Sequence, residues 1–349
     1  MNPSFQRLIT QATRLTQAGR LQDATAAIQA AFGAAVVPAG SQDPRVIDVE
    51  AREVKREVPQ SVKPVNPAPS SRFSSGSHSD AAGTREYKLY VPPGYTGQAL
   101  PLVVMLHGCT QNPDDFAAGT GMNDAALERN FLVLYPAQAQ NANHSRCWNW
   151  FHPTHQKRDH GEPALLAGMT RDVMKRYNID TQRVYVAGLS AGGAMAAILG
   201  DAYPDLFAAI GVHSGLPAGA AADVTSAFKA MRNGAAEQAG TAASPPTIVF
   251  HGDQDSTVHP ANGEQVVARS AGAVAPELER ARSSNGREYT RRIYKGSGGR
   301  VLAEHWAVHG AGHAWSGGNA RGSYTDAKGP DATQEMVRFF FANKLRNAH

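Results

Sequence analysis

The chain has 349 residues, of which 42% are hydrophobic and 18% are charged, and its formal net charge is +4. This composition is globular and fits one large or two medium domains. The basic residues are scattered and no stretch approaches ~18 consecutive apolar residues, which argues against a nucleic-acid partner and against a membrane span. The two cysteines, Cys109 and Cys147, are too few for a disulfide scaffold and form no Cys-x-x-Cys metal pair.

The N-terminal part of the chain differs in character from the rest. Its start contains no apolar segment of the kind that a secretory signal peptide needs, so we expect a cytoplasmic protein by default. Residues 1–33 carry apolar side chains at helical spacing, broken near Gly19, and predict a small helical hairpin. This hairpin resembles a single tetratricopeptide unit, which rarely buries its apolar face alone. The pattern therefore favours docking or self-association, with contact to a polymer surface as the alternative.

Residues 34–83 are rich in proline and serine and predict an extended linker, which leaves residues 84–349 as the catalytic domain. In that domain apolar strands alternate with helices. Strands are predicted at residues 86–91, 102–106, 131–135, 183–187, 208–213, 247–251, 291–294 and 304–308, and helices at residues 162–177, 191–202 and 332–344. This alternation predicts an α/β fold with a mostly parallel, doubly wound sheet that helices cover on both faces. Ligands of such sheets bind beyond the carboxyl ends of the strands.

The most informative motif is Gly-Leu-Ser-Ala-Gly at residues 188–192. It directly follows an apolar strand and directly precedes the predicted helix 191–202, which is the setting of a nucleophile elbow. The glycines let strand and helix approach closely, and the turn holds the Ser190 hydroxyl exposed at the end of the sheet. The motif therefore predicts Ser190 as a catalytic nucleophile. Without catalysis, the same residues would be a plain strand-to-helix turn.

A serine nucleophile needs a base that takes its proton, and in this fold the order along the chain is serine, acid, histidine. Asp253 and Asp255 both follow the predicted strand 247–251. We expect Asp255 to be the acid, because an aspartate directly after a glycine is usually a turn or cap residue. His313 lies deep in a glycine-rich loop near the C-terminus and is the predicted base. His309, at the start of that loop, is expected to hold the loop by hydrogen bonding.

The tetrahedral intermediate of acyl transfer needs two preorganised N–H donors. One is expected from Ala191, the residue after the nucleophile, and the other from Cys109, in the loop that follows the strand 102–106. Cys147, like Cys109, follows a strand on the catalytic side. A disulfide between them would pin the oxyanion loop, although it would fit poorly with a reducing cytoplasm. The alternative is two unrelated buried thiols.

Three of the four tryptophans lie on loops that flank the predicted catalytic residues. They are Trp148, Trp150 and Trp315. Aromatic side chains most often pack in a core, but this concentration near the site predicts a hydrophobic substrate-binding cleft.

Four segments together resemble the polyhydroxybutyrate (PHB) depolymerase family of α/β-hydrolases, which is related to feruloyl and acetyl-xylan esterases. They are Leu-His-Gly-Cys-Thr-Gln at 106–111, Cys-Trp-Asn-Trp-Phe at 147–151, Gly-Leu-Ser-Ala-Gly-Gly-Ala-Met at 188–195 and His-Gly-Ala-Gly-His-Ala-Trp-Ser-Gly-Gly at 309–318. The resemblance implies that Ser190, Asp255 and His313 form the triad and that Cys109 and Ala191 donate to the oxyanion. Because many members are secreted, it makes an extracellular location the alternative to the cytoplasm.

These observations predict a serine esterase that hydrolyses short-chain polyhydroxyalkanoates, as polymers or oligomers, through an acyl-enzyme. Its substrate is a polyester or a small ester, and the chemistry needs no metal and no organic cofactor. The alternative of the same class is a feruloyl or acetyl-xylan esterase that acts on plant-derived esters. A serine peptidase is a weaker alternative, and the complete serine, acid and histidine set argues against a non-catalytic binding protein.

Overall fold

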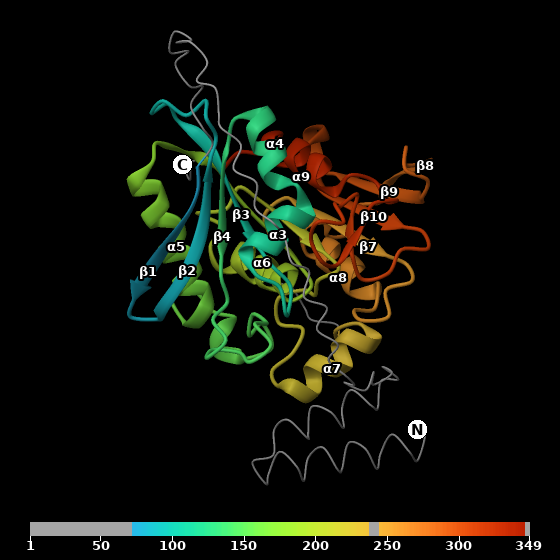
Figure 1. Ribbon diagram of the computed structural model, residues 1–349. Coiled ribbons are helices and arrows are strands. Elements are labelled where there is room, and N and C mark those ends of the chain that lie inside the picture. Colours follow the sequence, from blue (N-terminus) through green and yellow to red (C-terminus); the bar gives the residue numbers. More distant parts are fainter. Residues whose placement is uncertain (1–71, 237–243, 346–349) are drawn as a thin grey trace, which may run out of the picture. The chain divides into compact units, whose positions relative to one another are not determined.

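The computed structural model describes residues 72–236 and 244–345. The predicted helical hairpin and residues 34–71 of the predicted linker lie outside the described residues. A 10-stranded sheet runs through the described part, with helices packed against both of its faces (Figure 1). The order of neighbouring strands is β1-β2-β4-β3-β5-β6-β7-β10-β9-β8.

The strands in the middle of the sheet are parallel, and those at both of its edges are antiparallel. The strands β4, β3, β5, β6, β7 and β10 pair in parallel, whereas β1 and β2 on one side and β9 and β8 on the other pair antiparallel. This arrangement confirms the predicted mostly parallel α/β fold. The strands are β1 (Arg72–Asp80), β2 (Gly83–Val91), β3 (Leu100–Leu106), β4 (Leu132–Pro136), β5 (Ile179–Leu189), β6 (Ala209–His213), β7 (Thr247–Gly252), β8 (Glu277–Arg282), β9 (Glu288–Lys295) and β10 (Val301–Val308), with the separate short pair β11 (Trp315–Ser316) and β12 (Thr325–Asp326).

The helices form two layers. One face of the sheet carries α5, α6 and α8, and the other carries α3, α4 and α9. Their bounds are α3 (Pro113–Thr120), α4 (Met122–Arg129), α5 (Gly161–Arg176), α6 (Ala191–Ala202), α7 (Val224–Asn233), α8 (Ala261–Ala271) and α9 (Ala332–Phe341). Within the described ranges, none of these helices is long and apolar enough to cross a membrane.

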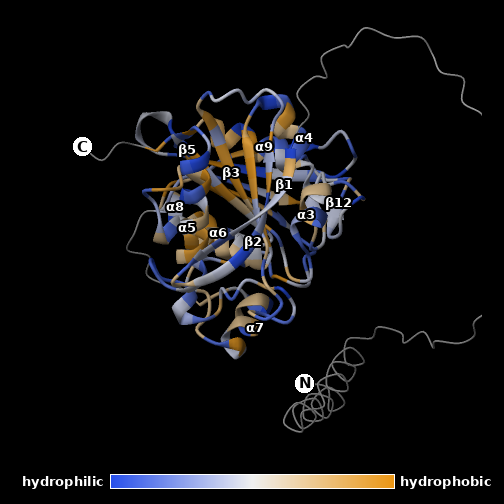
Figure 2. Ribbon diagram, turned by 60° about the vertical axis from the view of Figure 1, so that its left-hand side comes forward, coloured by the Kyte–Doolittle hydropathy of each residue, from blue (hydrophilic) through white to orange (hydrophobic). Residues whose placement is uncertain are grey.

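The central strands are apolar throughout because both of their faces are covered. In β3 the side chains of Leu102 and Val104 join the core under α5 and α6, whereas Val103 and Met105 join the core under α3, α4 and α9. Successive strand residues point to opposite faces, so a strand buried on both sides reads as a continuous hydrophobic run. Figure 2 shows how a central strand differs from one nearer the edge of the sheet: β3 is coloured as hydrophobic, and β2 is mostly pale to blue.

The predicted linker boundary at residue 83 is wrong, because Arg72–Asp80 forms the first strand of the sheet. β1 pairs along its whole length with β2. The sequence did not indicate this strand because its side chains are mostly polar and only that of His78 is buried. The His78 Nδ1 lies 2.6 Å from Asp172 Oδ2 on α5. The charged strand β8 and the short helices α3, α4, α7 and α8 were likewise not predicted.

We expect β1 to stabilise the domain, because its removal exposes the edge of β2 and unpairs Asp172 from His78. Two trimmed chains, one beginning at Arg72 and one at Gly83, differ only in this strand and its turn. The shorter chain should melt at least about 4 °C lower, the equivalent of roughly 1 kcal/mol or more in a domain of this size. Equal melting temperatures in scanning calorimetry would contradict this prediction.

Candidate active site

Ser190 lies in a strained turn between β5 and α6. Its φ of 57° and ψ of −120° fall in a region that non-glycine residues rarely adopt. The flanking glycines are required by space: a Cβ on Gly192 would lie 2.0 Å from the Leu106 carbonyl oxygen, and one on Gly188 would lie 2.3 Å from the Gly192 carbonyl carbon. The Ser190 N–H donates to the His213 carbonyl at 2.9 Å, which fixes the turn to the end of β6. The sequence pattern of strand, sharp turn and helix is thus present.

Asp255, and not Asp253, is hydrogen-bonded to His313. The Asp255 Oδ2 lies 2.7 Å from His313 Nδ1, while its Oδ1 accepts from the N–H groups of Thr257 at 2.9 Å and Val258 at 2.8 Å. Burial by itself would raise the pKa of the Asp255 carboxyl, but the hydrogen bond and charge of His313 and the Val258 N–H hold this pKa below its ordinary value. An ionised carboxylate on Nδ1 leaves the His313 Nε2 free to face a substrate.

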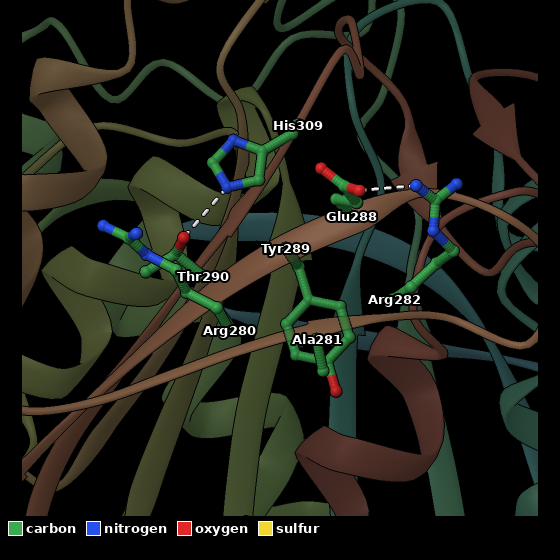
Figure 3. A pocket seen from close by; sticks show the side chains of 7 residues that line it. All are labelled: Arg280, Ala281, Arg282, Glu288, Tyr289, Thr290 and His309. Carbon is green, nitrogen blue, oxygen red and sulfur yellow. Dashed lines mark hydrogen bonds and ion pairs between the residues drawn. The ribbon is translucent and has the colours of Figure 1, made fainter.

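Asp253 belongs to a second hydrogen-bonded chain, which includes His309 and Thr290. The Asp253 Oδ2 lies 2.8 Å from His309 Nδ1, and His309 Nε2 lies 2.9 Å from Thr290 Oγ1 (Figure 3). The Gly310 N–H also donates to Asp253, at 2.7 Å. This chain ties the start of the 309–313 loop to β9 and to the Asp253 turn, which is the role expected for His309.

The predicted oxyanion donors lie on either side of the turn. A Cβ on Gly108, the residue before Cys109, would lie 3.6 Å from Ser190 Cβ, so this loop runs directly beside the serine. The side-chain oxygen of Gln111 accepts from the Gly108 N–H at 2.9 Å and holds the loop. Among the described residues, the N–H groups of Cys109 and Ala191 have no acceptor. Both donors are therefore available to an oxyanion.

The predicted disulfide between Cys109 and Cys147 is confirmed, with an S–S distance of 2.01 Å. The Thr110 N–H also donates to the Ser145 carbonyl at 2.7 Å, so the two loops are joined at two neighbouring points. Two residues after Cys147, the Asn149 backbone N–H donates to the side chain of Glu162 at 2.7 Å. Glu162 is buried, with 1% of its surface exposed. Sequence reasoning did not assign Glu162 to this network.

The tryptophans predicted to bind substrate are core residues instead. Trp148, Trp150 and Trp315 are 0%, 6% and 1% exposed. The indole N–H of Trp148 donates to the His107 carbonyl at 3.1 Å, and that of Trp315 to Thr333 Oγ1 at 3.0 Å. These side chains support the catalytic loops from below, and the prediction that they line a cleft is not supported.

Sequence reasoning also missed His213, which supports the histidine loop. It lies at the end of β6, where its ring stacks on Trp315 with centroids 5.1 Å apart. Burial lowers the pKa of His213 to about 3, so the ring is neutral. Its Nε2 accepts from the Ser316 N–H at 2.9 Å and so fixes the chain just after His313. The feature of the sequence that could have indicated this role is a histidine at the carboxyl end of a predicted parallel strand.

Comparison with known proteins places this chain in a family. The family described as "Esterase PHB depolymerase" matches residues 85–275. The chain belongs to the PHB depolymerase esterase family. The family resemblance inferred from the sequence is confirmed, and three of its four segments, at residues 106–111, 147–151 and 188–195, lie within the matched range.

Two depolymerases are among the relatives of this chain. It is 32% identical over 237 residues to poly(3-hydroxyalkanoate) depolymerase C of Paucimonas lemoignei, covering 64% of this chain and 57% of that protein. It is 29% identical over 268 residues to poly(3-hydroxybutyrate) depolymerase of Ralstonia pickettii, covering 70% of this chain and 54% of that protein. The chain thus spans little more than half the length of these two relatives.

Esterases of plant-derived esters are also similar. Feruloyl esterase B of Thermothelomyces thermophilus is 29% identical over 197 residues, which cover 51% of this chain and 67% of that protein. Among solved structures, an acetyl xylan esterase from Aspergillus awamori matches with a TM-score of 0.62 and 21% identity, covering 77% of this chain and 99% of that one. At this identity the structural match shows the shared fold alone.

The two aspartates should differ sharply in their effect on catalysis. If Asp255 orients His313, Asp255→Asn should lower kcat on a soluble butyrate ester by about 10³-fold or more, because the histidine then loses the correct tautomer. Asp253→Asn disturbs only the anchor of the loop and should lower kcat far less. Steady-state kinetics of both variants checks the ranking, and the reverse ranking would move the acid to Asp253.

The disulfide should matter for activity more than for the fold. Reduction frees the Cys109 loop, so kcat should fall by about tenfold or more, part of the ~10²–10³-fold that loss of an oxyanion donor costs. The circular dichroism of the backbone should change little. Cys147→Ala is the matched control and should respond no further to reductant. Full activity after titration has shown two free thiols would contradict this prediction.

Proposed function

We propose that the esterase hydrolyses short-chain 3-hydroxyacyl polyesters or oligoesters with Ser190, His313 and Asp255 as its catalytic triad. The observation that carries the proposal is the 2.7 Å hydrogen bond between Asp255 and His313, on loops that leave the same edge of the sheet as the strained Ser190 turn. A buried, ionised acid on Nδ1 and a serine held at a strand-to-helix turn are what acyl transfer requires.

In the proposed reaction, His313 Nε2 takes the proton of Ser190 Oγ as that oxygen attacks the ester carbonyl. The N–H groups of Cys109 and Ala191 stabilise the oxyanion of the tetrahedral intermediate. The intermediate collapses when the ester C–O bond breaks and His313 returns the proton to the leaving alkoxide. Asp255 stabilises the imidazolium in both steps. A water molecule then attacks the acyl-enzyme by the same route and releases the acid.

The substrate class is supported by the names of the relatives rather than by geometry. Both depolymerases match most of the described domain, from 29% to 32% identity. The similarity to feruloyl esterase B, which covers 67% of that protein, favours an esterase of plant-derived esters as the second candidate. The two candidates differ in the alcohol and the acid that the site must accept, and not in the chemistry of the bond.

A substrate panel tests the proposal. Purified enzyme should hydrolyse a 3-hydroxybutyrate oligomer with a higher kcat/KM than methyl ferulate, an acetylated xylo-oligosaccharide or a peptide amide. Ser190→Ala should lower kcat on each accepted ester by at least about 10³-fold, because the covalent route disappears. A preference for ferulate or acetyl-xylan would show that the substrates are plant-derived esters and not polyesters. Near-wild-type turnover by Ser190→Ala would overturn the mechanism.

A further inference from the structure

β8 is the outermost strand on one side of the sheet, and its charged side chains form a ladder of ion pairs with β9. The pairs are Glu277–Lys295 at 2.7 Å, Glu279–Arg291 at 3.1 Å and Arg282–Glu288 at 2.5 Å. Paired charges on an outer strand protect it against pairing with another chain. Arg280 does not fit this ladder. It lies opposite the neutral Thr290, and its side chain has no hydrogen bond or ion pair with any described residue.

Arg280 lines a pocket of about 600 Å³ between β8, β9 and His309. In Figure 3 the Arg282 guanidinium turns toward Glu288, whereas the Arg280 side chain turns to the side of the pocket where Thr290 and His309 lie. Since the Arg282 charge is neutralised by Glu288, Arg280 leaves the lining with one uncompensated positive charge.

His309 and Thr290 of the pocket wall form, together with Asp253, a hydrogen-bonded chain of acid, histidine and hydroxyl that resembles a catalytic triad but lacks its other requirements. Thr290 is 7% exposed and lies within the regular pairing of β9 with both β8 and β10. It has no strained turn and no neighbouring helix N-terminus to supply oxyanion donors. This chain therefore positions the loop, and Arg280 is the charged group among the lining residues that remains free to bind an anionic ligand.

We propose that this pocket binds the free carboxylate at the end of a hydroxyacyl chain, with Arg280 as its cationic partner. A guanidinium matches a carboxylate in shape and can donate two parallel hydrogen bonds to it. Glu288, the carboxylate among the lining residues, is already paired with Arg282, and the Asp253 carboxylate next to His309 is engaged by His309 and Gly310. Leu278, two residues before Arg280 on the same face of β8, is 63% exposed and offers an apolar contact to the alkyl part of the chain.

One loop links the pocket to the proposed catalytic site. His309 in its wall and His313 belong to one loop, and in the strand order β8 lies five steps from β5, the strand that ends at the Ser190 turn, which is about 24 Å at the usual strand spacing. In a polyester of hydroxy acids, the carboxyl end lies on the leaving-alcohol side of every ester bond. Binding at Arg280 would thus hold the carboxyl end of the chain while Ser190 attacks an ester bond several units away, so that acylation releases an oligomer that spans this distance. This inference rests on the proposed function and predicts that the enzyme acts on polyester chains from their carboxyl ends.

The test compares 3-hydroxybutyrate oligomers, from dimer to hexamer, as free acids and as methyl esters. The wild-type enzyme should prefer the free acid by about tenfold in kcat/KM once the oligomer is long enough to reach Arg280, mainly through KM, and added salt should weaken the preference. Arg280→Gln should abolish the preference and Arg280→Lys should retain part of it. None of these changes should alter kcat on 4-nitrophenyl butyrate, which has no carboxylate.

The matched control is the double variant Arg282→Gln/Glu288→Gln, which removes the adjacent ion pair without a change in net charge. It should keep the preference for the free acid. A preference that survives in Arg280→Gln, or a wild-type enzyme that treats acids and methyl esters alike at every length, would overturn the proposal.

A binding measurement separates this proposal from the proposed function. Ser190→Ala should bind the free-acid hexamer about tenfold more tightly than the methyl ester in isothermal titration calorimetry, and Ser190→Ala/Arg280→Gln should bind both alike. If the wild-type enzyme hydrolyses no oligomer, the proposed substrate class is wrong. The difference in calorimetric affinity between acid and methyl ester still shows whether the pocket binds a carboxylate. Equal binding of acid and ester by Ser190→Ala would refute the carboxylate site.

Discussion

The close contact of backbones at the Ser190 turn is the constraint on which the site depends. The start of α6 approaches the end of β3 so tightly that a side chain on Gly192 would overlap the Leu106 carbonyl. This contact sets the serine beside the loop that carries Cys109, and the hydrogen bond from Ser190 N–H to His213 sets it against β6. The strained φ of 57° is sustained because packing on both sides leaves the turn no other conformation.

Buried polar groups hold the surrounding loops against this fixed point. His213 supports the histidine loop from below, and the Cys109–Cys147 disulfide and Glu162 hold the loops on the other side. Burial lowers the pKa of His107 to about 4 and that of His213 to about 3, so these rings act as neutral hydrogen-bonding groups. Polar groups that are buried and fully paired fix one arrangement of loops, which is what preorganised catalysis needs.

The sequence predicted best what depends on local patterns. The apolar central strands, the glycines around Ser190 and the order of serine, acid and histidine each follow from short-range rules, and the structure brings Asp255 to His313 as expected. The outer strands β1 and β8 were missed because their side chains are polar and mostly exposed, so that only pairing with a neighbour reveals them. The tryptophans were misassigned because a loop in the sequence gives no sign of whether its aromatic side chains face solvent or the core.

The central claim is that Ser190 forms a hydroxyacyl-enzyme, and trapping that species tests it most directly. Wild-type enzyme mixed with a 3-hydroxybutyrate oligomer and quenched in acid within the first turnover should yield, by peptide mass spectrometry, a hydroxybutyryl adduct on the peptide that contains Ser190. The adduct should be absent from Ser190→Ala treated in the same way. An adduct on another residue, such as Thr290, or rapid hydrolysis with no covalent adduct at any quench time, would contradict the account.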